Sequence, residues 1–377
     1  MLCAAIFIIQ TGYGLILPLL PIYAEHRGFS LPWIGAMAAL YAASSFVSQW
    51  IFGRQSDVLG RRALLLFGSF ATALATGLFV LKVPAGAYLA FRALQGIGAG
   101  AFIPAANALV GDLVPDQRRG SAFGLLSSAS MGGFALGPFI GGVMGNFFGL
   151  RAPFGLGAIL AFLATVAVFQ GMPPMQRQHR ARPESKPRTA PLQEKLWPLY
   201  LINFGWTGLV GMYDTVWSLY MKSLGASNLV IGLSFTLFAI PLLLSNFLGG
   251  ALANRPGWRR KLIVGGSFLN AMTVILYIVS QNAWLSIGIS VLEAIAMSLI
   301  GPALQALLLS RTPDAWRGTI QGRFQAVGTL GALVMATFSG ILMTHNIKTP
   351  FWAGAALLVA TAVIFGWVRG GRVSNDN

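Results

Sequence analysis

The sequence predicts an all-α membrane protein with twelve transmembrane helices, arranged as two pseudo-symmetric bundles of six helices. Three observations lead to this fold class. Of the 377 residues, 55% are apolar and only 10% are charged, whereas about a quarter of the residues of a soluble protein are charged. Apolar runs of roughly 20 residues recur along the chain, each long enough to cross the ~30 Å hydrocarbon core of a bilayer as a helix. The two halves of the chain also resemble each other.

The apolar runs place six helices in each half of the chain. In the first half the expected spans are 2–24, 32–53, 62–82, 85–111, 119–146 and 150–171. In the second half they are 196–221, 228–252, 259–279, 282–309, 316–344 and 350–369. Strands of a β-barrel are excluded, because they would be only ~10 residues long and would alternate in polarity.

Residues 172–195 differ from the rest of the chain. They are rich in Pro, Arg, Gln and Ser and contain few apolar residues, a composition typical of a polar linker. We therefore expect a first bundle at residues 1–171, a cytoplasmic linker at 172–195 and a second bundle at 196–377.

The second half repeats the first at a nearly constant displacement. Early in each half the displacement is 197 positions: Gly28, Ser30, Ile34 and Gly35 reappear as Gly225, Ser227, Ile231 and Gly232. Later it is 198 positions: Pro104, Asn107, Asp112, Pro115, Asp116, Arg119, Gly120 and Gly124 correspond to Pro302, Gln305, Ser310, Pro313, Asp314, Arg317, Gly318 and Gly322. Matches at so many spaced positions indicate two equivalent halves. In an apolar chain, such a duplication is typical of a membrane transporter whose pathway lies between the repeats.

The net charge of +16 is distributed unevenly between alternate loops. Most basic residues fall in the even-numbered gaps and after the last span, among them Arg54, Arg61, Arg62, Arg118, Arg119, Arg177, Arg180, Arg182, Lys186, Arg188, Lys195, Arg255, Arg259, Arg260, Lys261, Arg311, Arg317, Arg369 and Arg372. The odd-numbered gaps carry only Arg27, Lys82, Arg151, Lys222 and Lys348. Since positive charge in short loops marks the cytoplasmic side, we expect both termini in the cytoplasm and the protein in a bacterial inner (plasma) membrane. The basic excess thus reflects topology and not nucleic-acid binding.

The sequence offers no pattern for a metal, a cofactor or catalysis. Cys3 is the only cysteine, and His26, His179 and His345 fall in predicted loops without metal-ligand spacing. No Gly-x4-Gly-Lys-Ser/Thr loop for ATP is present, and no obligate protein partner is indicated. We therefore do not expect an enzyme. No separate signal peptide is expected, because Met1 enters the first span without a basic leader; either that helix is short or the native start lies upstream.

A motif rich in glycine and arginine occupies the second gap: Gly53-Arg-Gln-Ser-Asp57-Val-Leu-Gly60-Arg61-Arg62. It resembles the loop signature of the major facilitator superfamily, in which an acid follows a glycine by four residues and precedes Gly-Arg-Arg/Lys. The equivalent region of the second half, Gly250, Asn254, Gly257, Arg259 and Arg260, resembles the degenerate second copy that such proteins carry. The resemblance implies a twelve-helix transporter.

Local physics suggests a role for this motif. Gly53 allows close approach of helices and Gly60 permits a tight turn, while Asp57 can accept hydrogen bonds from a helix N-terminus. Arg61 can pair with Asp112 at the cytoplasmic end of the fourth span, so that the motif and this acid form a conformational latch that breaks as the halves rock. The alternative is that these charges only set the topology.

A second motif lies in the fourth span: Phe91-Arg92-Ala-Leu-Gln95-Gly96-Ile-Gly98. It resembles the Arg-x-x-Gln-Gly motif of the same superfamily, and by that resemblance Arg92 is linked to proton coupling. An arginine about two turns from the outer end of a membrane helix is costly unless it faces protein, water or an acid. The alternative is an arginine that extends to the outer interface.

The fifth span carries glycines at every fourth position: Gly133-Phe-Ala-Leu-Gly137-Pro138-Phe-Ile-Gly141-Gly142. Such a stripe permits close helix packing, and Pro138 favours a kink. The motif resembles the one associated with exporters of the superfamily, the drug:proton antiporters in particular. Outward transport is what this resemblance implies, while a plain packing seam would use the same residues.

Two acids lie deep in predicted spans, Asp214 in the seventh and Glu293 in the tenth. An apolar environment penalises the charged form of a carboxyl group, so either acid is a candidate for proton uptake and release. Glu293 is the repeat equivalent of Gln95 and lies about 15 Å from the outer end of its helix, nearer the midplane where transporter sites lie. We therefore place it ahead of Asp214. The alternative is an acid neutralised by a neighbouring polar group.

Polar, aromatic and methionine side chains at helical spacing predict the substrate cavity. Such a lining suits a lipophilic cation. The first span lacks the carboxylate that many multidrug members of the superfamily carry there, so coupling is not assigned to it. The predicted lining residues are Gln10, Tyr13, Gln95, Asn203, Thr207, Trp217, Ser290 and Met297.

The sequence therefore favours a secondary active transporter that exports a small, amphipathic or drug-like solute in exchange for protons by alternating access. Its partners are that solute, protons and the lipid bilayer. Two alternatives stay open. One is a proton-coupled or facilitative importer of a metabolite such as a sugar or an organic acid. The other is a membrane assembly or scaffold protein of the same fold that moves nothing.

Overall fold

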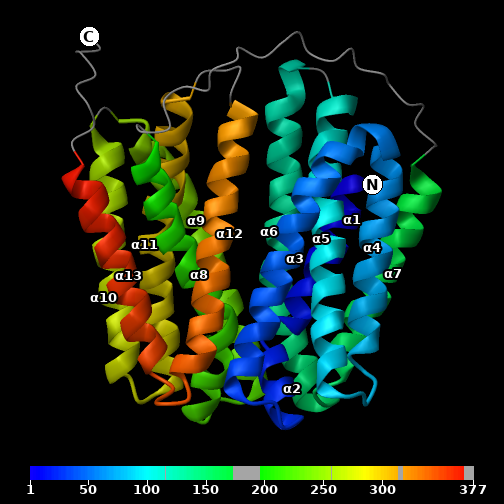
Figure 1. The fold of residues 1–377 in the computed structure, drawn as a ribbon, viewed down its shortest axis with the longest axis horizontal. Helices are drawn as coiled ribbons and strands as arrows, with labels where there is room; N and C mark the ends of the chain where they lie inside the picture. The colour runs from blue at the N-terminus through cyan, green and yellow to red at the C-terminus, as the bar shows by residue number, and fades with distance from the viewer. Residues whose placement is uncertain (115, 173–195, 256, 313–316, 369–377) are drawn as a thin grey trace. The chain divides into compact units, whose positions relative to one another are not determined.

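The computed structural model describes residues 1–114, 116–172, 196–255, 257–312 and 317–368, and every regular element within them is a helix (Figure 1). Side chains are described there except at residues 53–58, 111–112, 116–117, 119–121, 123 and 317–319. The predicted linker, apart from Met172, lies outside the described residues.

The helices follow the predicted order. The first half forms α1 (Leu2–Ile16), α2 (Leu20–His26), α3 (Leu31–Leu59), α4 (Arg61–Leu78), α5 (Ala85–Leu113), α6 (Asp116–Phe147) and α7 (Ala152–Gly171). The second half forms α8 (Trp197–Ser223), α9 (Asn228–Ala253), α10 (Trp258–Val279), α11 (Ala283–Ser310), α12 (Arg317–Leu342) and α13 (Thr349–Trp367). With α1 and α2 taken as one segment, the predicted twelve-helix fold is confirmed.

The first predicted span, 2–24, is interrupted at residues 17–19, which the sequence analysis did not anticipate. Pro18 has no backbone N–H to continue the helical ladder. The Leu19 amide instead donates to the Ile16 carbonyl at 3.1 Å, a tighter turn than that of an α-helix. The helix resumes at Leu20, and Leu2–His26 remains a single apolar segment of 25 residues.

α3 is longer than the predicted span 32–53, because it continues to Leu59. Its apolar part ends at Phe52, and apolarity was the only signal used to place the boundary. The motif that follows is therefore not a loop: its first residues close α3, Gly60 alone lies between the helices, and Arg61 begins α4. Gly60 has a φ of +87°, so the tight turn predicted there is present.

Nine of the described helices, counting α1 with α2, are long and apolar enough to cross a membrane by length and composition. α4, α6 and α8 are the others, and they have 18, 32 and 27 residues. Arg61 and Arg62 lower the mean hydropathy of α4, many glycines and serines lower that of α6, and α8 contains Asp214 and Lys222. All twelve segments therefore have the length of a membrane span, but small or polar residues lower the mean hydropathy of α4, α6 and α8.

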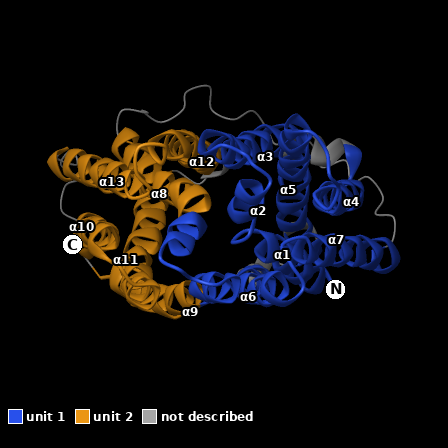
Figure 2. Ribbon diagram, turned by 90° about the horizontal axis from the view of Figure 1, so that it is seen from below, with its two compact units in different colours: residues 1–181, 217–236 blue, residues 182–216, 237–377 orange. Residues whose placement is uncertain are grey.

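Spatial contacts divide the chain into two compact units, coloured separately in Figure 2. Unit 1 comprises residues 1–181 and 217–236, and unit 2 comprises residues 182–216 and 237–377. The end of α8 and the start of α9 are thus grouped with the first unit. The bundle boundaries predicted from the sequence, 1–171 and 196–377, stay a prediction.

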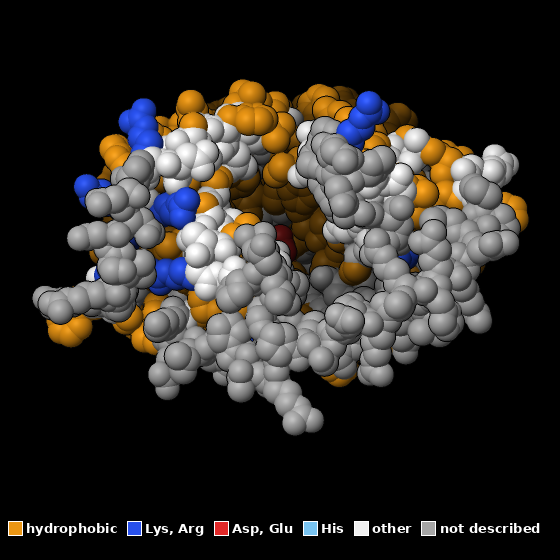
Figure 3. Space-filling model, turned by 90° about the horizontal axis from the view of Figure 1, so that it is seen from above, with side chains coloured by type: hydrophobic (Ala, Val, Ile, Leu, Met, Phe, Trp, Pro, Cys, Tyr) orange, Lys and Arg blue, Asp and Glu red, His pale blue; other side chains and the backbone are white. Residues whose placement is uncertain are grey.

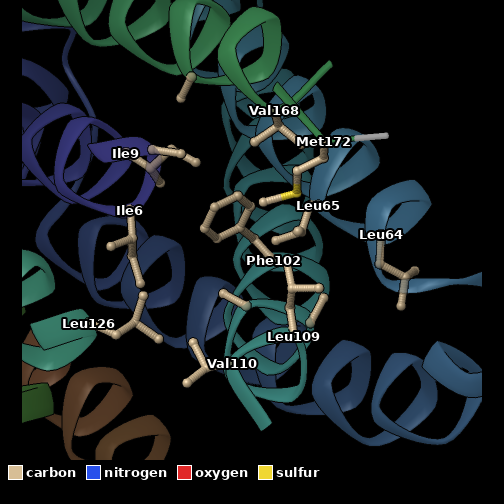
Figure 4. Packing of buried hydrophobic residues seen from close by; sticks show 14 residues of the cluster. Ile6, Ile9, Leu64, Leu65, Phe102, Leu109, Val110, Leu126, Val168 and Met172 are labelled. Carbon is tan, nitrogen blue, oxygen red and sulfur yellow. The ribbon is translucent and has the colours of Figure 1, made fainter. Parts of the chain in front are cut away.

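Each unit has an apolar core between its helices. In unit 1, α5 packs against α3 and α4, and α1 packs against α6 and α7. Figure 4 shows Ile6 of α1, Phe102 of α5 and Val168 of α7 within one cluster of this core. In unit 2, α10 packs against α11 and α13, and a second cluster includes Ile263 and Phe365.

Equivalent glycines of the two halves adopt the same backbone conformation. Gly28 and Gly225, displaced by 197 positions, have φ values of +82° and +81°. Gly60 and Gly257, displaced by the same number, have values of +87° and +74°. Each glycine lies just before the next helix, α3 and α9 for the first pair and α4 and α10 for the second. The sequence repeat is therefore also a repeat of turns that residues with a Cβ rarely adopt.

Candidate functional site

Glu293 is the buried acid of unit 2. It lies in α11 and is only 1% exposed. The hydroxyl of Tyr213, in α8, donates to Glu293 Oε1 at 2.7 Å, and the hydroxyl of Tyr277, in α10, donates to Oε2 at 2.7 Å. Both carboxyl oxygens are thus satisfied from two neighbouring helices, as a buried polar group requires.

The two tyrosines can serve both protonation states of Glu293. A carboxylate accepts at both oxygens, as in the observed arrangement, whereas a protonated carboxyl group must donate one hydrogen bond. Since a phenolic hydroxyl can donate or accept, one tyrosine can reverse its bond when a proton arrives. Tyr277 is fully buried, whereas Tyr213 is half-buried. The arrangement can therefore hold or release a proton without leaving a carboxyl oxygen unpaired.

Aromatic rings enclose this site. The Tyr213 and Tyr277 rings meet edge to face with centroids 6.4 Å apart, and Phe351 of α13 lies 6.3 Å from the first and 5.5 Å from the second. Ser290 and Met297, one turn away from Glu293 on α11, are buried as well. Three helices of unit 2 thus surround the acid with apolar surface.

The predicted cavity residues of α8 form hydrogen bonds with different parts of the fold. Asn203 Nδ2 donates to the Phe324 carbonyl of α12 at 2.7 Å, and Thr207 Oγ1 donates to Asn203 Oδ1 at 3.4 Å. Trp217 Nε1, in the part of α8 grouped with unit 1, donates to Ser234 Oγ of α9 at 2.8 Å. These polar groups hold helices together in the structure. Asp214 is half-buried.

Unit 1 contains a chain of polar groups at the Arg92 motif. Arg92 is 3% exposed, so it does not extend into the interface. Its Nη1 donates to Gln95 Oε1 at 2.9 Å, and Gln95 Nε2 donates onward to Thr76 Oγ1 at 2.9 Å. Its Nε donates to the Met37 carbonyl at 3.3 Å, and the guanidinium carbon lies 4.5 Å from the Tyr41 ring centroid. Neutral acceptors and a ring face accommodate the buried cation.

Three predicted cavity residues of unit 1 line one small internal cavity. Gln10 and Tyr13 of α1 and Gln95 of α5 surround it, together with Tyr41 and Thr76. Its volume is about 20 Å³, enough for about one water molecule. Gln10 Nε2 also donates to Ser130 Oγ of α6 at 3.1 Å. The structure thus brings these residues together with the Arg92 chain.

The glycine motif of α6 packs directly against α1. A Cβ added at Gly137 would lie 2.6 Å from the Thr11 carbonyl oxygen and 2.7 Å from Gly14 Cα. A Cβ at Gly133 or Gly141 would come even closer to a backbone carbonyl oxygen, that of Phe7 or of Leu15. The predicted close packing of this stripe is therefore confirmed.

Gly142 lies on a different face of α6, where a Cβ would come 3.0 Å from Gly232 Cα of α9. Pro138 is inside α6.

The predicted latch falls largely outside the described residues. The side chains of Asp57 and Asp112 are among those not described, so the pairing of Arg61 with an acid stays a prediction. Arg61 is half-buried.

Arg62 and its repeat equivalent Arg260 contact the ends of helices instead. Arg62 Nη2 donates to the Phe169 carbonyl of α7 at 2.7 Å, with its guanidinium 5.3 Å from the Phe169 ring. Arg260 Nη2 donates to the Phe365 carbonyl of α13 at 3.3 Å, with its guanidinium 6.0 Å from the Phe365 ring. Each arginine thus supplies a donor and a positive charge to a helix C-terminus.

Sequence reasoning missed Tyr213 and Tyr277, the partners of Glu293. The available signal was that a buried carboxyl group needs hydrogen-bond donors, and both tyrosines lie within predicted spans. It also missed Thr76 and Tyr41, which complete the surroundings of Arg92 and Gln95.

Comparisons with known proteins agree with this architecture. The sequence profile of the family described as Major Facilitator Superfamily matches residues 2–218 and 199–376. Multidrug resistance protein 2 of Bacillus subtilis (strain 168) is 26% identical over 382 residues, covering 97% of this chain and 94% of that protein. Multi-drug resistance efflux pump PmrA of Streptococcus pneumoniae (strain ATCC BAA-255 / R6) is 27% identical over 387 residues, covering 96% and 93%.

Two solved structures share the fold. A bacterial homologue of the human lysosomal transporter Spinster, in an inward-facing and occupied conformation, superposes with a TM-score of 0.78 at 15% identity, covering 97% of this chain and 93% of that one. The nucleoside transporter NupG gives a TM-score of 0.79 at 13% identity, covering 97% and 98%. At such low sequence identities, these similarities show a shared fold alone.

Proposed function

The chain belongs to the Major Facilitator Superfamily, and we propose that it exports a small, amphipathic or drug-like solute in exchange for protons by alternating access. As a member of this family it is an integral membrane protein and a secondary transporter of small molecules, not an enzyme. The direction of transport, the solute class and the coupling ion are the proposed parts.

Proton coupling rests mainly on Glu293. It is an acid buried in a membrane-spanning helix, and its two oxygens accept from Tyr213 and Tyr277 at 2.7 Å each. Ionisable groups at such depth are costly and are typically part of a substrate or proton path. Because the tyrosine hydroxyls can switch between donor and acceptor, the site supports loading and unloading of a proton. Asp214 is the second candidate.

The equivalent positions of the two halves differ in a way that fits this role. Gln95 in α5 corresponds to Glu293 in α11, and Arg92 corresponds to Ser290. In unit 1 the amide oxygen of Gln95 accepts from Nη1 of Arg92 at 2.9 Å. In unit 2, the carboxyl group of Glu293 accepts from tyrosine hydroxyls instead. We therefore assign the titrating site to unit 2 and a supporting role to Arg92.

Outward transport of a drug-like solute is supported by sequence relatives and by the glycine motif. Two of the relatives bear multidrug resistance or efflux names, and the motif from Gly133 to Gly142 resembles that of exporters. Tyr13 stacks on Tyr41 and Phe134 with centroids 5.4 Å and 6.4 Å apart. Aromatic faces of this kind suit an amphipathic cation. The latch of Arg61 with Asp57 and Asp112 remains part of the proposal.

We further propose the inner (plasma) membrane of a bacterium, with both termini in the cytoplasm. Lys and Arg side chains are the conspicuous charged groups among the coloured residues on the face drawn in Figure 3, and basic residues favour the cytoplasmic side. A reporter that is active only in the cytoplasm should be active when fused at residue 180 and inactive when fused at residue 149. The opposite pattern at both sites would invert the orientation.

A solute screen in everted membrane vesicles tests the function. Vesicles containing the protein should accumulate a lipophilic cation when the proton gradient is imposed, and should lose it when an ionophore collapses the gradient. Vesicles without the protein are the control. Accumulation in right-side-out vesicles instead would indicate an importer, and no gradient-dependent movement of any solute class would favour a protein that does not transport.

A further inference from the structure

A basic hollow lies in unit 1 at the end of the bundle where α2, α4 and α6 finish. Its volume is about 740 Å³, and its lining includes His26, Arg27, Lys82 and Arg151. These residues come from three separate segments: the end of α2, the connection from α4 to α5, and the connection from α6 to α7. Three of the five basic residues in the odd-numbered gaps therefore meet at one place.

No described acid of unit 1 is available to neutralise this hollow. Glu25 is the only Asp or Glu of that unit whose side chain the structure describes, and its Oε2 already accepts from Lys222 Nζ at 2.7 Å. Lys82 and Arg151 are exposed, and among the described residues no ion pair involves them. The hollow thus carries an uncompensated positive charge.

Arg27 is held in place rather than free to move. Its Nη2 donates to Tyr23 Oη at 2.7 Å and to the Leu81 carbonyl at 3.1 Å, and its guanidinium lies 5.2 Å from the Tyr23 ring centroid and 5.8 Å from that of Tyr88. A fixed charge in the wall costs less to organise around an anion than a mobile one.

The start of α7 adds to the positive potential. Arg151 is the N-cap residue of α7. In the first turn, the amides of Ala152 and Phe154 donate to the carbonyls of Gly149 and Arg151 at 3.1 Å each, and Pro153 has no N–H. These amides are not free to bind a ligand, but the helix dipole still favours negative charge near this end. The dipole of α7 therefore adds to the positive potential of the basic side chains that line the hollow.

Apolar surface adjoins these charges. Phe148 lines the hollow and is 71% exposed, and its neighbour Phe147 is 69% exposed. Basic residues and aromatic rings at the ends of membrane helices typically lie at the interface, at the level of the lipid headgroups. A soluble anion would contact only the basic side chains. A phospholipid can contact these side chains with its headgroup and the exposed rings with its acyl chains.

We propose that this hollow binds an anionic phospholipid, with the headgroup phosphate facing Lys82 and Arg151 and the acyl chains against Phe148. Arg27 forms the rigid wall of the site. The proposal does not depend on which solute the protein moves.

The test is a titration of the purified full chain in detergent with phosphatidylglycerol, followed by native mass spectrometry. Lys82→Gln and Arg151→Gln should each weaken binding about five-fold, since a basic residue near an anionic lipid contributes ~1 kcal/mol. Phosphatidylcholine with the same acyl chains should bind equally to all variants. Lys261→Gln, an exposed residue at the start of α10, is the matched control for loss of one charge and should bind phosphatidylglycerol as the wild type does.

Three results would overturn the proposal. Unchanged phosphatidylglycerol binding in both variants would show that the hollow is not the site. An equal loss in Lys261→Gln would indicate non-specific attraction. Displacement of the lipid by millimolar inorganic phosphate would indicate a site for a soluble anion. The thermal unfolding of each variant should match the wild type, because both replaced side chains are exposed.

Discussion

Glu293→Gln should abolish proton-driven transport while the protein remains folded in the membrane. Glutamine has nearly the same size and can still pair with the hydroxyls of Tyr213 and Tyr277, which now lie 2.7 Å from the carboxyl oxygens, but it cannot bind or release a proton. With a gradient of one pH unit, each proton exchanged supports about a ten-fold solute accumulation, because ~1.4 kcal/mol is a factor of ten. The variant should show no accumulation in a vesicle assay.

Solute counterflow distinguishes loss of coupling from loss of the carrier. In the absence of a proton gradient, Glu293→Gln should still exchange labelled for unlabelled solute. Asp214→Asn is the matched variant, since it neutralises the other acid of the predicted spans, which is half-buried. If Glu293→Gln accumulates solute as the wild type does and Asp214→Asn does not, Asp214 and not Glu293 carries the coupled proton. If both keep full gradient dependence, neither carries the proton.

Gly137→Ala should strongly destabilise unit 1. The added methyl group would lie 2.6 Å from the Thr11 carbonyl oxygen and 2.7 Å from Gly14 Cα, and both are backbone atoms that cannot rotate away. Overpacking of this kind costs typically 1–3 kcal/mol and occasionally more. The expected result is a clearly lowered midpoint of thermal unfolding in detergent and reduced amounts of protein in the membrane.

Gly132→Ala is the matched control within the same helix. A Cβ at Gly132 would meet only the Phe7 ring, at 3.6 Å, which is an ordinary van der Waals contact. Since alanine favours a helix over glycine by about 1 kcal/mol, this variant should be neutral or slightly stabilising. Equal unfolding midpoints for the two variants would show that α6 and α1 do not pack as the structure has them.

The fold was predictable because its main signals are local or periodic. Apolar runs marked the helices, and the displacement of 197 positions between Gly28 and Gly225 reappears as matching φ values of +82° and +81°. Helix ends were less accurate. The extension of α3 to Leu59 lies beyond its apolar part, where hydropathy contains no information on helix length. Pro18 is visible in the sequence, but the apolar run around it was predicted to form one uninterrupted helix.

The site was predictable only in part, because side-chain partners depend on how each helix is rotated against its neighbours. Asp214 and Tyr213 are adjacent, and successive residues of a helix point about 100° apart. Asp214 was predicted as the second candidate after Glu293, whereas the neighbouring Tyr213, which was not predicted, is the residue that bonds to Glu293. Asn203 and Thr207 share a helical face with Asp214, but they bond within the fold. Glu293 itself was predicted to lie deep in the span 282–309, and its side chain is 1% exposed in the structure.

Proton movement during transport by the purified protein tests the central claim most directly. In liposomes with a trapped pH-sensitive dye and no imposed gradient, a solute gradient should drive protons in the direction opposite to the solute, at a constant ratio. Glu293→Gln should move no protons under the same conditions. Solute movement without proton movement in the wild type, or protons moving in the same direction as the solute, would contradict proton-coupled antiport.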